Sequence, residues 1–116
     1  MTAHFYCWEP ALGLDPHSPD FRDRRRRIQD SGEQPTQRLL DFVSALSSRY
    51  PDDANDDSIW AAAPLQDEIS GGHINFAVTW SAYDRVISFV VTTAHEHGLH
   101  CYDPQSGKFY PLSGPE

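Results

Sequence analysis

The sequence predicts a single α+β domain: a two-layer sandwich of element order βαββαβ, with a four-stranded antiparallel sheet and helices on one face. Residues 73–80 alternate large apolar and smaller side chains, with the period of a half-buried strand. Residues 83–94 follow with apolar side chains at helical spacing. Residues 103–107 (DPQSG) are turn chemistry between two short strands. A length of 116 residues is typical of one domain, so residues 1–116 are taken as one unit.

The first half of the chain predicts one strand and two helical segments. Residues 4–8 (HFYCW) form a short aromatic strand with alternate side chains on opposite faces. Ser18 and Pro19 are a helix N-cap and first helical residue, and they open a weakly amphipathic helix. A better apolar stripe follows Thr36 and stops before Pro51, because the residue before a proline disfavours helix.

The second half predicts three more strands, one helix and a closing hairpin. Residues 58–65 are the second strand candidate, and a Gly-Gly turn joins them to the strand at 73–80. Ser81 is expected to cap the helix that follows. Residues 99–102 form the last strand of the sheet, and residues 108–112 return beside it.

These elements have the ferredoxin-like order, and right-handed crossovers place the first and third strands at the centre of the sheet. The strand that carries Cys101 then flanks the strand that carries Cys7, so we expect the two sulfurs within one strand spacing. Trp8 and Trp80 are both expected in the core.

The chain is acidic, with a formal net charge of −8 and a pI near 5.0. No Lys or Arg occurs between Tyr50 and Asp84. Such a protein repels nucleic acid and anionic membranes and attracts basic partners. The opening MTAHFYCWEP has neither a basic start nor an apolar run, so we expect a cytoplasmic protein with both cysteines as thiols.

Three histidines near the end of the last helix are candidate metal ligands. His95, His97, His100 and the adjacent Cys101 are ligand types that zinc prefers. On a helix, however, His95 and His97 differ by about 200° of rotation. His100 and Cys101 point to opposite faces of a strand. We therefore expect no metal or other cofactor, and metal binding is kept as an alternative.

Nucleophilic catalysis is the weaker chemical hypothesis. Cys7 or Cys101 would need a base such as His4 or His100, and the alternation of the strands sets these groups apart. No common catalytic signature occurs in the chain. We expect that the protein is not an enzyme.

The arginine run at residues 24–27 suggests nucleic-acid binding only at first sight. Asp20, Asp23 and Asp30 lie at spacings that allow ion pairs along a helix. The net negative charge and the lack of interleaved aromatic residues also disfavour nucleic acid. We expect a solvated helix whose arginines pair with these aspartates.

An acidic surface around Trp60 is the predicted partner-binding site. Acidic side chains around an aromatic anchor can capture a basic partner quickly and then hold it. The candidate residues are Asp52, Asp53, Asp56, Asp57, Trp60, Asp67 and Glu68.

Four segments carry a family resemblance that covers nearly the whole chain. They are FYCWEP at 5–10, LLDFVSALSSRYP at 39–51, VTW at 78–80 before a capped helix, and GLHCYDPQSG at 98–107. With them the chain resembles small bacterial immunity proteins encoded beside polymorphic or type VI secretion toxins. The resemblance implies a role, the neutralisation of a secreted toxin, and implies no particular binding residue.

The sequence therefore predicts an immunity protein that occludes the active site of a cognate toxin domain with a basic surface. The association is expected to be tight and salt-sensitive. The alternative is a small ligand-sensing or metal-binding regulatory domain that uses His95, His97 and His100.

Overall fold

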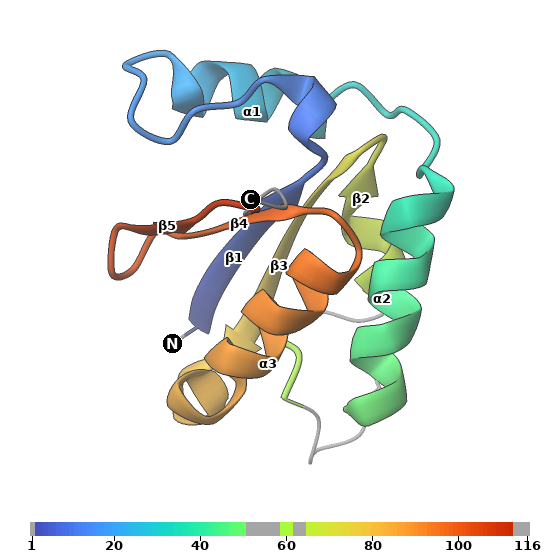
Figure 1. The fold of residues 1–116 in the computed structure, drawn as a ribbon, viewed down its shortest axis with the longest axis vertical. Coiled ribbons are helices and arrows are strands. Elements are labelled where there is room, and N and C mark those ends of the chain that lie inside the picture. Colours follow the sequence, from blue (N-terminus) through green and yellow to red (C-terminus); the bar gives the residue numbers. More distant parts are fainter. Residues whose placement is uncertain (1, 51–58, 62–64, 113–116) are drawn as a thin grey trace.

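Strand β1 (Thr2–Trp8) is the central strand of an antiparallel sheet. The computed structural model describes residues 2–50, 59–61 and 65–112. β1 pairs with β3 (His73–Thr79) on one side and with β4 (His100–Asp103) on the other. β2 (Ile69–Ser70) and β5 (Lys108–Tyr110) complete a five-stranded sheet of order β2-β3-β1-β4-β5 (Figure 1). The predicted central pair is confirmed.

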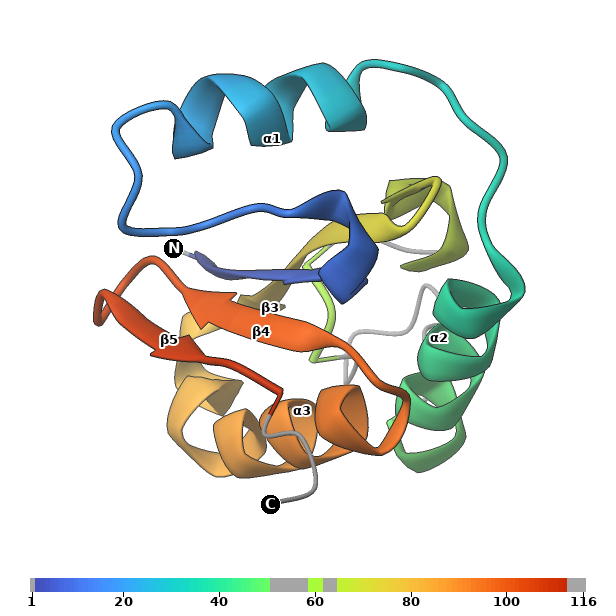
Figure 2. The ribbon, with the colours of Figure 1, turned by 45° about the horizontal axis from the view of Figure 1, so that its top comes forward.

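Helices lie on both faces of this sheet. α2 (Gln37–Arg49) and α3 (Tyr83–Glu96) cover one face, and α1 (Phe21–Gln29) covers the other (Figure 2). The prediction of four strands with helices on one face is therefore wrong in these two details, although the α+β class is confirmed. The physical reason is that β1 carries large aromatic side chains on both faces, so each face needs a cover.

Of the strand predicted at 58–65, the structure describes residues 59–61 and Leu65, and these do not form a regular strand. Trp60 forms a single bridge to Val78, and the backbone of residues 59–61 hydrogen-bonds to residues 77–79. Leu65–Glu68 forms a 3₁₀ turn, and β2 begins only after it.

One of the three predicted helix starts is confirmed. The hydroxyl of Thr36 accepts a hydrogen bond from the backbone N–H of Leu39 at 3.3 Å and caps α2. Ser81 does not cap α3, because a 3₁₀ turn at Trp80–Ala82 precedes that helix. Ser18 also does not cap α1, which begins after Asp20.

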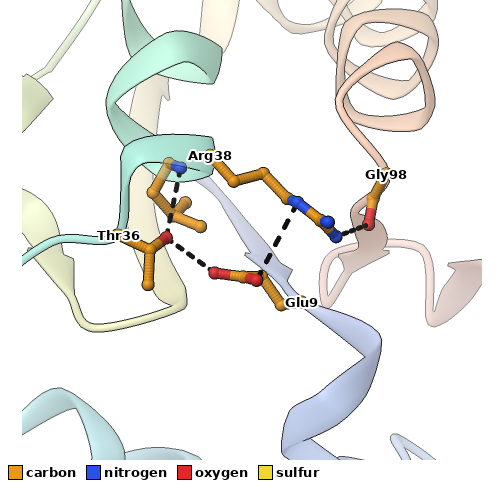
Figure 3. A network of polar contacts seen from close by, with 5 residues as sticks. Glu9, Thr36, Arg38 and Gly98 are labelled. Atoms are coloured by element: carbon orange, nitrogen blue, oxygen red, sulfur yellow. Dashed lines mark hydrogen bonds and ion pairs between the residues drawn. The ribbon is translucent and has the colours of Figure 1, made fainter.

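Glu9, directly after β1, ties the start of α2 to the end of α3 (Figure 3). Its Oε2 accepts from the Thr36 hydroxyl at 2.6 Å, and its Oε1 lies 3.9 Å from Arg38 Nε. Arg38 Nη1 in turn donates to the Gly98 carbonyl at 3.2 Å. Gly98 has a φ of 72°, the left-handed conformation in which glycine commonly follows the end of a helix. The network joins three elements that meet at one end of the sheet.

The two faces of the sheet build two apolar clusters. The larger cluster lies under α2 and α3 and includes Phe5, Cys7, Phe42, Phe76 and Val90. The smaller cluster lies under α1 and consists of Trp8, Leu14 and Phe21 with half-buried neighbours. Trp8 is fully buried, as predicted.

Trp80 is 48% exposed, so its predicted place in the core is wrong. β3 ends at Thr79, and the 3₁₀ turn that follows breaks the alternation that would have turned the indole inward. The indole instead stacks on Tyr83, with ring centres 5.3 Å apart.

Candidate functional site

The predicted acidic surface lies only partly within the described residues. Asp52, Asp53, Asp56 and Asp57 lie outside them. Asp67 is exposed and Glu68 is half-buried, both in the 3₁₀ turn before β2.

Trp60 cannot be the exposed anchor of that surface. Its side chain is 5% exposed, and its ring packs edge-on against Phe76 and Tyr50. Its indole N–H donates to the Tyr50 carbonyl. The residue is part of the core, and it fixes the segment 59–61 against the end of α2.

The exposed aromatic group near this segment is Trp80. Among the described residues it is the one large hydrophobic side chain that is exposed. The backbone N–H of Thr79 donates to the Ile59 carbonyl at 2.8 Å, so Trp80 lies beside the segment that the acidic stretch leads into. Further along α3 lies a shallow groove of about 190 Å³. The groove is lined by Ile87, Ser88, Val91, Thr92 and Tyr110.

Each histidine of the candidate metal group has its own partner. His95 Nε2 lies 3.0 Å from the Tyr110 carbonyl, and His97 Nδ1 lies 2.9 Å from the Thr93 carbonyl. His100 Nδ1 accepts from the backbone N–H of Leu112 at 2.8 Å. Within residues 2–50, 59–61 and 65–112, no three His, Cys, Asp or Glu side chains are grouped to hold a metal ion.

Cys7 and Cys101 lie directly opposite each other on β1 and β4, as predicted. Both are free thiols in the larger apolar cluster. Burial raises the pKa of the Cys7 thiol, and the contact with Cys101 raises it further. His100 packs on the other face of the sheet against Trp8, so no thiolate-imidazole pair forms here.

A second candidate site is a pocket of about 420 Å³ between α1, β1 and the turn after β4. It is lined by Tyr6, Phe21, Arg22, Arg25, Arg26, Tyr102 and Pro104. Arg25 is the buried cation of this pocket, with 7% of its surface exposed. Its guanidinium carbon lies 4.0 Å from the ring centre of Tyr6, and its Nη1 donates to Gln29 Oε1 at 2.6 Å.

The expected ion pairs of the arginine run are not formed. Among the described residues the one ion pair joins Arg38 and Glu9, and it lies outside α1. The other three arginines of the run are exposed, as predicted, whereas the side chain of Arg25 is buried between α1 and the sheet. The prediction is therefore wrong in its ion pairs and in the exposure of Arg25. Burial lowers the pKa of Arg25, and the neighbouring Arg26 and Arg22 lower it further.

His73 is the neutral group beside this cation. Its imidazole is fully buried, and neither ring nitrogen has a hydrogen-bond partner among the described residues. Burial, and then the charge of Arg25, lower the pKa of His73 to about 3. The imidazole is therefore uncharged at neutral pH and does not repel the guanidinium.

Asp103 explains the turn sequence DPQSG. Its carboxylate is fully buried and accepts from the Gln105 N–H at 2.9 Å and the Ser106 hydroxyl at 2.8 Å. The hydroxyl of Tyr83 on α3 donates to the other side of the same group. Burial and this bond raise the pKa of Tyr83 to about 12. The turn is a structural anchor between α3 and the sheet.

Comparisons of the chain with protein-family models, curated proteins and solved structures found no match. The resemblance to immunity proteins is not tested by them and stays a prediction. No helix in the described part of the chain is long and apolar enough to cross a membrane.

Sequence reasoning missed Arg25, His73 and Trp80 as residues of interest. Arg25 had a signal, because it falls four residues after Phe21 and three before Ile28 on the inward face of α1. His73 and Trp80 had no such signal. The residue at which β3 ends, and the packing of α1 on the second face of the sheet, depend on tertiary contacts.

Proposed function

We propose that this protein is an immunity protein, which binds the basic surface of one secreted toxin domain and blocks its active site. The observation that carries the proposal is the position of Trp80. An indole that is 48% exposed, stacked on Tyr83 and placed beside the segment after the acidic stretch, has the features of a binding anchor.

Rigidity of the anchor supports the proposal. The ring of Tyr83 supports the Trp80 indole from behind, and Tyr83 is itself held by the carboxylate of Asp103. A side chain that is already ordered loses less conformational entropy when a partner binds. The exposed carboxylate of Asp84 lies in the first turn of α3, next to this pair.

Charge supports the choice of a basic partner. The chain carries a formal charge of −8, and its acidic stretch from Asp52 to Asp57 adjoins Ile59 in the sequence. Opposite charges across an interface accelerate association and make it sensitive to salt. The anchor and the acidic stretch would then act together on one toxin surface.

Co-expression with the product of the neighbouring gene tests the proposal. We expect rescue of growth, and a complex whose Kd rises steeply between low and moderate salt. Trp80→Ala should weaken the complex by about 30-fold or more, as for a hot-spot aromatic, and Trp80→Phe by less.

Charge variants provide the matched control. The quadruple variant Asp52, Asp53, Asp56 and Asp57 to Asn should lose both affinity and salt dependence. The same four-charge change at Asp15, Asp20, Asp23 and Asp30, around α1, should leave both unchanged. Wild-type affinity in Trp80→Ala and in the first quadruple variant, or no rescue of growth, contradicts the proposal.

A further inference from the structure

The pocket beneath α1 combines a buried positive charge with aromatic walls, and the proposed toxin-binding surface does not use it. The pocket is lined by residues of α1, β1, β4 and the turn after β4. The helix α1 lies on the face of the sheet opposite α2 and α3 (Figure 2). The pocket volume of about 420 Å³ lies within the usual range for small-molecule sites and is large enough for a ring with an attached acidic group.

Arg25 forms no ion pair with a described carboxylate, although the charge of Asp30 acts on it from a greater distance. Its one hydrogen bond among the described residues goes to the neutral amide oxygen of Gln29, and its other contact is the face of the Tyr6 ring. The adjacent imidazole of His73 is uncharged at neutral pH. Arg25 is 7% exposed, and its guanidinium has N–H groups without an acceptor among the described residues. A bound anion would stabilise this buried charge strongly through charge-assisted hydrogen bonds.

Arg22 and Arg26 add two more cations at the rim of the same pocket. They fall three residues before Arg25 and one after it, which places all three on one side of α1. Neither guanidinium makes a hydrogen bond or an ion pair with another described residue. Asp23 and Asp30 line a second hollow with Arg26 and Arg27, so Arg26 borders both hollows.

The remaining walls are aromatic and flat. Phe21 meets Tyr102 edge-on at 5.5 Å between ring centres, and Tyr6 stacks on Tyr102 at 6.3 Å. Pro104 closes the side formed by the turn, which the buried Asp103 holds in place. Aromatic walls favour a planar ring, and arginine forks favour a tetrahedral dianion with several acceptor oxygens.

We propose that this pocket binds a small phosphate monoester carried on an aromatic ring. Arg25 contacts the phosphate from the floor, Arg22 and Arg26 contact it from the rim, and the ring lies against Tyr102 and Phe21. The acidic charge of the whole protein disfavours a nucleic-acid strand and leaves a small ligand as the occupant.

Calorimetric titration of the full chain at low salt tests the site, with phenyl phosphate, inorganic phosphate and phenol as probes. We expect phenyl phosphate to bind, inorganic phosphate to bind about ten-fold more weakly, and phenol not to bind. In NMR spectra, the Nε–Hε signal of Arg25 should shift with phenyl phosphate. Equal binding of phenyl phosphate and inorganic phosphate would refute the role of the aromatic walls.

Arginine variants locate the binding. Arg22→Gln and Arg26→Gln should each lower the affinity for phenyl phosphate by about ten-fold, because each removes one charge-assisted contact. Arg27→Gln is the matched control: it removes the same charge from the same helix outside the pocket, and it should bind like the wild type. Because Arg25 is buried, Arg25→Gln also perturbs folding, so the two rim variants decide the question.

Three results would overturn the assignment. The first is no detectable binding of phenyl phosphate by the wild type. The second is a loss of affinity in Arg27→Gln equal to the loss in Arg22→Gln and Arg26→Gln, which indicates that phenyl phosphate is attracted to the net positive charge of the helix and not to this pocket. The third is a single-stranded oligonucleotide that binds ten-fold more tightly than phenyl phosphate, which indicates a strand-binding surface. None of these results depends on toxin binding, so this site and the proposed function can fail separately.

Discussion

The two faces of the sheet bury different chemistry, although the same central strands supply both. Toward α2 and α3, β1 and β3 present Ala3, Phe5, Cys7, Ile74, Phe76 and Val78. Toward α1 they present Tyr6, Trp8, His73 and Asn75, with Arg25 inserted from above. The first face gains its stability from apolar burial, and the second contains the cation and the imidazole that cost free energy to bury.

The buried polar groups of the two faces make the difference concrete. Asp103, on the face of α3, has a hydrogen-bond donor for each of its oxygens. His73, on the face of α1, has none among the described residues, and Arg25 has a single amide acceptor. A polar group that is buried without partners destabilises a fold, and such groups concentrate at functional sites. The unpartnered groups under α1 therefore support the ligand site proposed above. We call the sheet face under α2 and α3 the scaffold face, because its buried carboxylate is fully satisfied.

The largest expected effect comes from removing an aromatic side chain from the scaffold face. Phe76→Ala should lower the free energy of unfolding by about 3–5 kcal/mol, because Phe76 is 1% exposed in the larger cluster. Phe21→Ala is the corresponding change in the smaller cluster. It should lower the free energy of unfolding by less, because it mainly loosens the packing of α1 on the sheet. Urea unfolding measures both, and equal losses would break the distinction between the faces.

Asp103→Ala comes next, with an expected loss of about 3 kcal/mol. The change leaves the Tyr83 hydroxyl and the turn N–H groups without their acceptor in a buried place. Asp84→Ala, an exposed carboxylate on the same helix, should change stability by less than about 1 kcal/mol. Thermal or urea unfolding compares the two, and similar losses would show that Asp103 is not an anchor.

His73 should make stability fall in mild acid. Its pKa of about 3 lies below the ordinary 6.5, so between these values the unfolded chain binds a proton that the folded chain does not. Stability is therefore full above pH 6.5 and falls by up to about 1.4 kcal/mol per pH unit as the pH drops toward 3. Between pH 6.5 and 5 the loss attributable to His73 is about 2 kcal/mol.

The variant His73→Leu should remove this part of the pH dependence, and its stability at pH 7 should not fall, because two unpaired nitrogens disappear. His17→Leu, an exposed control near the same face, should keep the wild-type slope. His100 also has a lowered pKa because of burial, but it titrates in all three proteins. An unchanged slope in His73→Leu would show that His73 is not the group responsible.

The smallest effect concerns the network that holds the helix ends together. Thr36→Ala removes both the cap of α2 and the hydroxyl that donates to Glu9, and should cost about 1 kcal/mol. Thr36→Ser keeps the hydroxyl and should cost a few tenths of that. The measurement is again the midpoint of urea unfolding. Identical midpoints for Thr36→Ala and Thr36→Ser would show that the hydroxyl network does not contribute to stability.

Alternation along the strands was enough to predict the scaffold face. The period of two groups Phe5 with Cys7 on one strand, and Ile74 with Phe76 and Val78 on the other. All five lie in the larger cluster. The same rule failed at Trp80, because a period does not show where a strand ends. The predicted fold also placed no helix on the second face of the sheet. Trp8 lies on that face, and burying its large side chain requires a helix there.

The candidate sites were harder to predict because they depend on contacts between distant segments. The arginine run was interpreted through spacings within its own helix, whereas Arg25 is held by Tyr6 from another element. Trp60 was expected at the surface because acidic residues surround it in the sequence. It is buried because the bridge to Val78 turns its ring onto Phe76. Local charge patterns do not show which side of a segment packs.

Native-state hydrogen exchange tests most directly whether the two faces play different parts. We expect the amides of residues 25–29 in α1 to open with a free energy about 2 kcal/mol or more below that of residues 42–46 in α2. Phenyl phosphate should narrow this gap by protecting α1 and should leave α2 unchanged. Exchange of both helices only through global unfolding, with no response to phenyl phosphate, would contradict the account.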